Sequence, residues 1–223
     1  MSPSSNLRIV SGAPAGGTAA SDGAPDDDDL RLVERSVGGD MQAWGRLYQL
    51  YFHRLYQHIC YLTGTPTSAE DLTQETFARA LSSLGTFGGR SRLSTWLHGI
   101  AINVVRKHRD ATRKVDATRQ RLTAVREAVP LAGDLERRHL QRTRAQALCR
   151  ILDELPDHLR EAFVLRDLQG LEVAEAAAQL GVTEANLRVR AHRARVRVHD
   201  VLVQEGWIEP ASPTEPTNKG GGR

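Results

Sequence analysis

The chain has 223 residues, a formal net charge of +3 at pH 7 and only 5% aromatic residues. At roughly 100–200 residues per domain, this length indicates one or two small domains and argues against one large enzyme core. No run of about 18 apolar residues occurs, and no basic segment followed by an apolar core opens the chain, so we expect a cytoplasmic protein that does not span a membrane. Two cysteines, Cys60 and Cys149, are too few for a cysteine-rich metal site. With no phosphate-binding glycine motif either, the sequence predicts no cofactor, no metal, no catalytic residues and no small-molecule substrate.

Both ends of the chain are poor in large apolar residues. Residues 1–29 are rich in Ser, Gly, Ala and Pro and end in four aspartates, which predicts a disordered acidic leader, and residues 206–223 predict a disordered tail. Residues 111–149 carry 9 Lys and Arg against 4 Asp and Glu, so positive charge is concentrated in the middle of the chain. We therefore expect two domains, residues 30–110 and 141–205, joined by a basic linker, residues 111–140.

Helical periodicity recurs in the first half of the chain. Apolar residues recur every three or four positions from Trp44 to Leu62, and Gly64 stops this stripe. Ser68 and Ser91 are candidate N-caps for the next two helices. No segment alternates apolar and polar residues as a β-strand would. The predicted fold class is all-α: a three- or four-helix bundle, the basic linker and a second small helical domain.

The second domain contains a sharp local signal. A short apolar segment, 172–180, meets Gly181, and a longer helical segment, 184–203, follows. This is the spacing of a helix-turn-helix, in which Ala177 is small enough for close helix packing and Gly181 can adopt the left-handed conformation of the turn. Thr183 is positioned to cap the second helix.

The second helix of this motif is strongly basic. It carries arginine at positions 188, 190, 193, 195 and 197 together with His192, and no acidic residue stands between Ala185 and His199. Such a run favours contact with phosphates, and the first residues of the helix, Glu184, Asn186 and Arg188, would face base edges in the major groove of duplex DNA. The alternative is a surface helix whose arginines pair with carboxylates elsewhere in the second domain.

Two further patterns lie in the first domain. Asp71, Gln74 and Glu75 share one side of a helix with Phe77 close by, which by itself is explained by an ordinary solvated acidic face. Basic and aromatic side chains then follow a glycine-rich loop, a mixture that suits melted or single-stranded nucleic acid: Arg90, Arg92, Trp96, Asn103, Arg106 and Lys107. The alternative for Trp96 is a place in the core.

In this order and spacing, the chain resembles bacterial sigma factors of the sigma-70 superfamily, specifically the extracytoplasmic-function (ECF) group with only sigma domains 2 and 4. The resemblance covers about 40–110 and 145–203. It rests on Asp71-Leu72-Thr73-Gln74-Glu75-Thr76-Phe77, on Ser94-Thr95-Trp96-Leu97, on Leu152-Asp153-Glu154-Leu155-Pro156, and on Gly181-Val182-Thr183 with His192-Arg193-Ala194-Arg195.

The resemblance implies a non-enzymatic promoter-specificity subunit that binds core RNA polymerase, recognises the −35 and −10 promoter elements and assists promoter melting. It implies that Asp71, Gln74, Glu75 and Phe77 bind the β′ clamp helices of core polymerase, whose β subunit is also a partner. The implied contacts with the −10 element are Arg90, Arg92, Trp96, Asn103, Arg106 and Lys107. The implied −35 contacts are Thr183, Glu184, Asn186, Arg188, Arg190, His192, Arg193 and Arg195. An anti-sigma factor is a further expected partner.

The sequence also departs from the family pattern. Ile102 stands where the family commonly has arginine, directly before Asn103, and Arg188-Val189-Arg190-Ala191 replaces a frequent Lys-Ser-Arg-Leu. The competing function is a stand-alone helix-turn-helix regulator that binds its operator as a dimer. That function explains 170–203 but gives no role to the acidic Asp71–Glu75 face or to the Trp96 helix.

Overall fold

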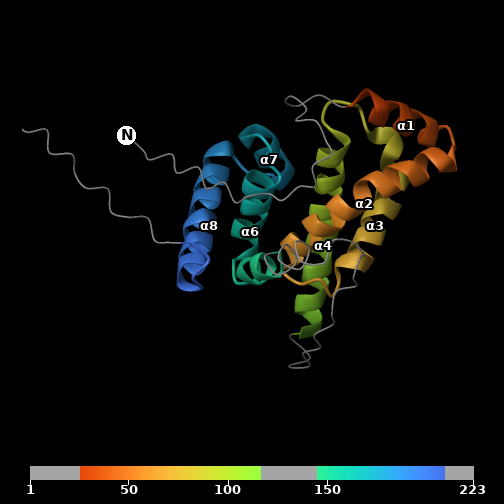
Figure 1. Ribbon diagram of the computed structural model, residues 1–223. Coiled ribbons are helices and arrows are strands. Elements are labelled where there is room, and N and C mark those ends of the chain that lie inside the picture. Colours follow the sequence, from red (N-terminus) through yellow and green to blue (C-terminus); the bar gives the residue numbers. More distant parts are fainter. Residues whose placement is uncertain (1–25, 117–144, 209–223) are drawn as a thin grey trace, which may run out of the picture.

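The computed structural model describes residues 26–116 and 145–208, and within these residues the secondary structure is helical with no strand. The predicted all-α fold class is therefore confirmed. Figure 1 shows the N-terminal helices α1 to α4 beside the group α6, α7 and α8. The elements are α1 (Asp27–Val37), α2 (Met41–Thr63), α3 (Ala69–Ser83), η1 (Leu84–Thr86), α4 (Leu93–Asp116), α6 (Asp157–Phe163), η2 (Val164–Leu168), α7 (Val173–Leu180) and α8 (Glu184–Gln204). A further helical segment covers 145–153.

We call described residues 26–116 the N-terminal domain and described residues 145–208 the C-terminal domain. The prediction that a disordered leader extends to residue 29 is wrong at its end, because α1 begins at Asp27. The side chain of Asp26 accepts a hydrogen bond from the Asp28 amide, and the acidic first turn matches the positive end of the helix dipole. Residues 1–25 of the predicted leader lie outside the described residues.

Helices α2, α3 and α4 form the core of the N-terminal domain. Helix α2 ends at Thr63, and Gly64 stops it there as the sequence predicted, in the left-handed conformation at φ 75°. Of the two predicted serine caps, Ser68 stands at the N-cap position of α3 but makes no capping hydrogen bond, and Ser91 is wrong. Ser68 has helical dihedral angles, so its hydroxyl caps no amide, and α4 begins at Leu93, two residues after Ser91.

The C-terminal domain contains the predicted helix-turn-helix. Gly181 has φ 67° between α7 and α8, and the Thr183 hydroxyl accepts a hydrogen bond of 3.2 Å from the Asn186 amide. Helices α7 and α8 contact each other, and Ala177 of α7 and Leu187 of α8 are both buried. Both local predictions for this turn, the left-handed glycine and the threonine cap, are thus confirmed.

The two domains pack against each other. Their buried apolar side chains form one continuous cluster, and helix α2 contacts both α6 and η2. Helix α4 continues to Asp116, six residues into the predicted linker 111–140. The rest of that linker, and the predicted tail from 209 onward, lie outside the described residues.

Candidate nucleic-acid and polymerase interface

Helix α8 has one apolar side and one side in solvent. Leu187, Ala191, Ala194 and Val198 are buried and hold the helix on the C-terminal domain. This spacing of four, three and four residues leaves the opposite side of the helix exposed. Val189 is 49% exposed, which is unusual for a large apolar side chain and places it on the free surface of the helix.

The basic side chains lie on two flanks of that exposed surface. On one flank Arg188 pairs with Glu184 at 2.8 Å, and Arg195 pairs with Asp167 of η2 at 3.1 Å. On the other flank Arg190, Arg193 and Arg197 form no ion pair with any described residue. The alternative, that carboxylates of the second domain pair with the arginines of α8, therefore holds for one flank only. We call the flank with Arg190, Arg193 and Arg197 the free flank.

The pairing on the first flank is exposed. The side chain of Arg188 is 61% exposed and that of Arg195 is 42% exposed. Exposed ion pairs contribute little, typically 0–1 kcal/mol, so phosphates can compete with them. Burial raises the pKa of Asp167, whose side chain is 20% exposed, and the ion pair with Arg195 opposes this shift. The predicted −35 residues Thr183, Asn186 and His192 are exposed as well.

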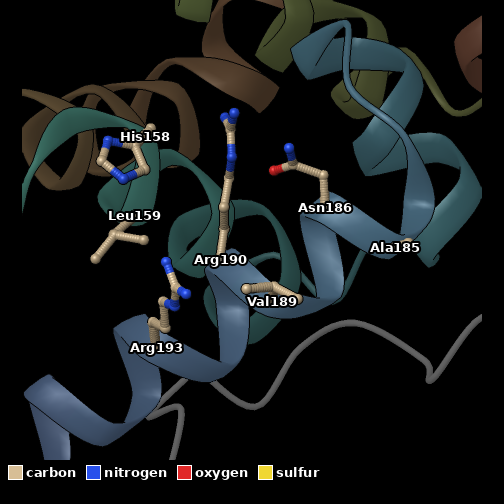
Figure 2. A pocket seen from close by; sticks show the side chains of 7 residues that line it. All are labelled: His158, Leu159, Ala185, Asn186, Val189, Arg190 and Arg193. Atoms are coloured by element: carbon tan, nitrogen blue, oxygen red, sulfur yellow. The ribbon is translucent and has the colours of Figure 1, made fainter.

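A cavity of about 430 Å³ lies beside the free flank. Figure 2 shows Arg190 and Arg193 of α8 next to His158 and Leu159 of α6, with Asn186 at the other edge. The sequence analysis did not single out His158. Only the packing of α6 against α8 brings His158 to these arginines, because 32 positions separate it from Arg190 along the chain.

Helix α3 presents the predicted acidic face. Asp71, Gln74 and Glu75 are exposed, and Glu75 pairs with Arg79 one turn later. Phe77, the fourth residue predicted for this contact, is not part of the exposed face, because it is only 4% exposed in the free chain. Phe77 packs against three rings of α2, those of Trp44, Tyr48 and Phe52.

Most of the predicted −10 residues are at least partly exposed. Arg90, Asn103 and Lys107 are exposed, and Arg92 is half-buried. Trp96 is also half-buried and tilts against Phe87 with ring centroids 5.5 Å apart, so it packs against the loop that precedes α4 and keeps part of its ring in solvent.

Arg106, the remaining predicted −10 residue, is bound within the molecule. Its guanidinium donates two hydrogen bonds to Glu161 of α6, from Nε at 2.8 Å and from Nη2 at 2.7 Å. These bonds raise the pKa of Arg106 and fix its plane against the carboxylate. In this arrangement Arg106 is not free for a phosphate, contrary to its prediction as a −10 contact.

Comparison with known proteins decides the family. The sigma-70 region 2 model matches residues 47–115 and the sigma-70 region 4 model matches 145–198. The chain belongs to the ECF sigma factors of the sigma-70 family. It is 36% identical over 176 residues to the ECF sigma factor BldN of Streptomyces coelicolor, covering 77% of this chain and 66% of BldN. It is 30% identical to the sigma-H factor of Pseudomonas aeruginosa, covering 79% of this chain and 94% of that factor.

Solved structures agree on the fold. The sigma factor RpoE of Bartonella quintana, crystallised with the anti-sigma factor NepR, superposes with a TM-score of 0.55 at 26% identity and covers 71% of this chain and 95% of RpoE. CnrH, solved in complex with the cytosolic domain of CnrY, superposes with a TM-score of 0.56 at 24% identity, covers 80% of this chain and 99% of CnrH, and shows the shared fold. Sigma factors of this family are promoter-specificity subunits of RNA polymerase, and this ECF sigma factor is one of them. Among its described residues, no helix is long and apolar enough to cross a membrane.

Proposed function

We propose how the two domains of this ECF sigma factor divide the work of promoter recognition. The exposed acids of α3 bind core polymerase, the loop before α4 and the exposed residues of α4 hold the melted −10 strand, and α8 reads duplex DNA at the −35 element. The chain itself makes and breaks no bond. It acts with RNA polymerase in the cytoplasm.

The free flank of α8 is the observation that best supports this division. Arg190, Arg193 and Arg197 have no carboxylate partner among the described residues, so they repel one another in water, and phosphates that neutralise them release counterions. The paired flank has a different use, because Arg188 and Glu184 stand on the first turn of a recognition helix, where side chains meet base edges. We assign Arg190 and Arg193 to the phosphates and Arg188 with Glu184 to the bases.

The N-terminal domain supplies the second DNA contact. Trp96 keeps part of its ring exposed beside the loop that carries Arg90, and an aromatic ring next to a cation suits an unstacked base. Each captured base contributes about 1–3 kcal/mol, so binding alone can stabilise an opened strand. Asn103 and Lys107 lie exposed further along the same helix.

An anti-sigma protein is the proposed regulatory partner. The structural relative RpoE was crystallised with the anti-sigma factor NepR. The exposed apolar side chains of α8, Val189 and Val196, lie among its arginines. An amphipathic segment with acidic residues would complement such a surface.

Reconstituted transcription tests the proposed function. The full chain is added to core polymerase on a promoter library, and duplex binding is measured with and without core. We expect promoter opening and transcripts only when both core and this chain are present. Tight binding of a palindromic duplex without core, and no transcript with core, would support a stand-alone dimeric regulator instead.

A further inference from the structure

Val189 lies on the side of α8 that is opposite the C-terminal domain. An α-helix turns by about 100° per residue, so Val189 lies about 200° round the helix from Leu187, two positions before it. Leu187 is 0% exposed, whereas Val189 is 49% exposed. A single exposed apolar side chain is ordinary on a protein surface, so only its position is informative. That position is the centre line of the surface that we assign to duplex DNA.

The side chains on either side of Val189 already have roles in the proposed function. The rotation of the helix places Arg188 and Arg190 about 100° to either side of Val189. Arg190 belongs to the flank that we assign to phosphates, and Arg188 to the flank that we assign to bases. Val189 is also the sixth residue of α8, within the first two turns, which are the part of a recognition helix that meets base edges. When both flanks bind DNA, Val189 therefore faces the base edges.

The chemistry of valine restricts what it can recognise there. Its side chain has no hydrogen-bond donor or acceptor, so it cannot read the polar groups of the major groove. Thymine is the one base that presents an apolar group in that groove, its C5 methyl. Contact between this methyl and the methyls of Val189 removes apolar surface of both from water. A cytosine in the same place would bring its amino group towards a side chain that cannot accept a hydrogen bond, which is unfavourable.

Val196 has the same exposure at a different depth along the helix. It lies two turns after Val189, close to the same line of α8, and is 45% exposed. Seven residues at 1.5 Å each place it about 10 Å further along the helix axis. Figure 2 shows Val189 on α8 between Asn186 and Arg193, in the part of the helix that carries the proposed −35 contacts. Val196 lies beyond the first turns, so it serves as a matched control.

We propose that Val189 is a specificity-determining residue that reads the C5 methyl group of one thymine in the −35 element. The thymine stands on either strand, and its methyl packs against the valine methyls when α8 enters the major groove. This inference rests on the proposed function, because it names the base feature that one residue of the same recognition helix reads.

Selection from a randomised −35 element locates the thymine. Holoenzyme formed from core polymerase and the full chain selects duplexes from a library in which only the −35 element varies. We expect one position at which the wild type requires a thymine on one strand and Val189→Ser accepts other bases. Val196→Ser should keep the wild-type preference. Both positions are exposed, so both variants should keep wild-type helicity by circular dichroism.

Deoxyuridine in place of that thymine tests the methyl group itself. Uracil presents the same hydrogen-bonding groups as thymine and lacks only the C5 methyl. The replacement should weaken promoter binding by wild-type holoenzyme about fourfold, the factor that corresponds to one buried methyl group. It should weaken binding by Val196→Ser equally. It should leave the affinity of Val189→Ser unchanged, because serine makes no contact with the methyl.

Each other outcome overturns a defined statement. A selected −35 element without a thymine, or a loss of affinity on deoxyuridine replacement that is equal in the wild type and Val189→Ser, overturns the role of Val189. So does a variant Val189→Ser that keeps the wild-type base preference, even if it binds an anti-sigma protein more weakly, because Val189 would then contact protein only. If the wild-type holoenzyme selects no −35 sequence and makes no transcript, the proposed function itself fails.

Discussion

Helices α3 and α4 leave their charged side chains in opposite environments. On α3 the acids Asp71 and Glu75 stand in water, and Glu75 meets only Arg79 on its own helix. On α4 the bases Arg106 and Arg109 are bound by carboxylates of the C-terminal domain. The acids of α3 are therefore open to solvent, whereas these two bases of α4 are bound within the molecule. The difference lies in tertiary packing, because only the α4 side chains meet carboxylates of another domain.

The largest expected effect concerns Phe77, which lies under the α3 face. Phe77→Ala should lower the free energy of unfolding by about 3–5 kcal/mol, because it empties the site between the rings of Trp44 and Tyr48. Leu81→Ala on the same helix, where the side chain is 38% exposed, should cost far less. Urea denaturation followed by circular dichroism measures both. A Phe77→Ala protein of normal stability that no longer binds core would return this residue to the contact surface.

The second effect concerns the buried side of α4. His58 of α2 and His98 of α4 stack with ring centroids 4.1 Å apart, and both are buried. Burial lowers the pKa of His98 to about 4 and lowers the pKa of His58 well below its usual value. The unfolded chain binds these protons below pH 6.5 and the folded chain does not, so stability falls as the pH drops from 6.5 towards 4.

His98 alone should lower the free energy of unfolding by about 2 kcal/mol at pH 5. Denaturation curves at pH 7 and pH 5 measure this loss directly. His98→Gln should reduce the pH dependence of the free energy of unfolding. The control His53→Gln changes an exposed histidine of α2 and should leave that pH dependence unchanged. An equal pH dependence in all three proteins would mean that His98 has the same pKa in the folded and the unfolded chain.

The third effect tests the open face of α3. Glu75→Arg reverses a charge that we assign to core binding, and it should weaken the affinity for core polymerase about tenfold or more with unchanged helicity. Glu34→Arg makes the same change at an exposed position of α1 and serves as the control. Affinity is measured by titration of core with labelled full chain. If both variants bind core equally well, the acidic face of α3 is not the contact.

The smallest effect compares the two flanks of α8. Arg190→Ala should lower the slope of log affinity against log salt concentration by about one for the holoenzyme on promoter DNA. Arg188→Ala should change that slope less, because Arg188 is already paired with Glu184. Promoter binding across a series of salt concentrations measures both slopes. Equal slopes in both variants and the wild type would remove the free flank from the DNA interface.

The residue roles could be predicted from the sequence only in part. The exposed positions of Asp71 and Glu75 follow from helical spacing, since a residue one position from a buried stripe faces water. Phe77 shows the limit of that inference, because a large aromatic side chain near a polar face can turn inward, and its neighbours come from another helix. His158 lies beside the arginines of α8 only through tertiary packing.

The sequence alone determined what depends on near neighbours: the helices, the left-handed Gly181, the Thr183 cap and the basic recognition helix. These features rest on interactions within about four residues, so spacing and residue type suffice to find them. Only the tertiary structure decided which charges are free. The ion pair of Arg106 with Glu161 joins residues 55 positions apart, and no local pattern marks which of many arginines meets which carboxylate. That choice depends on how two separately folded surfaces fit together.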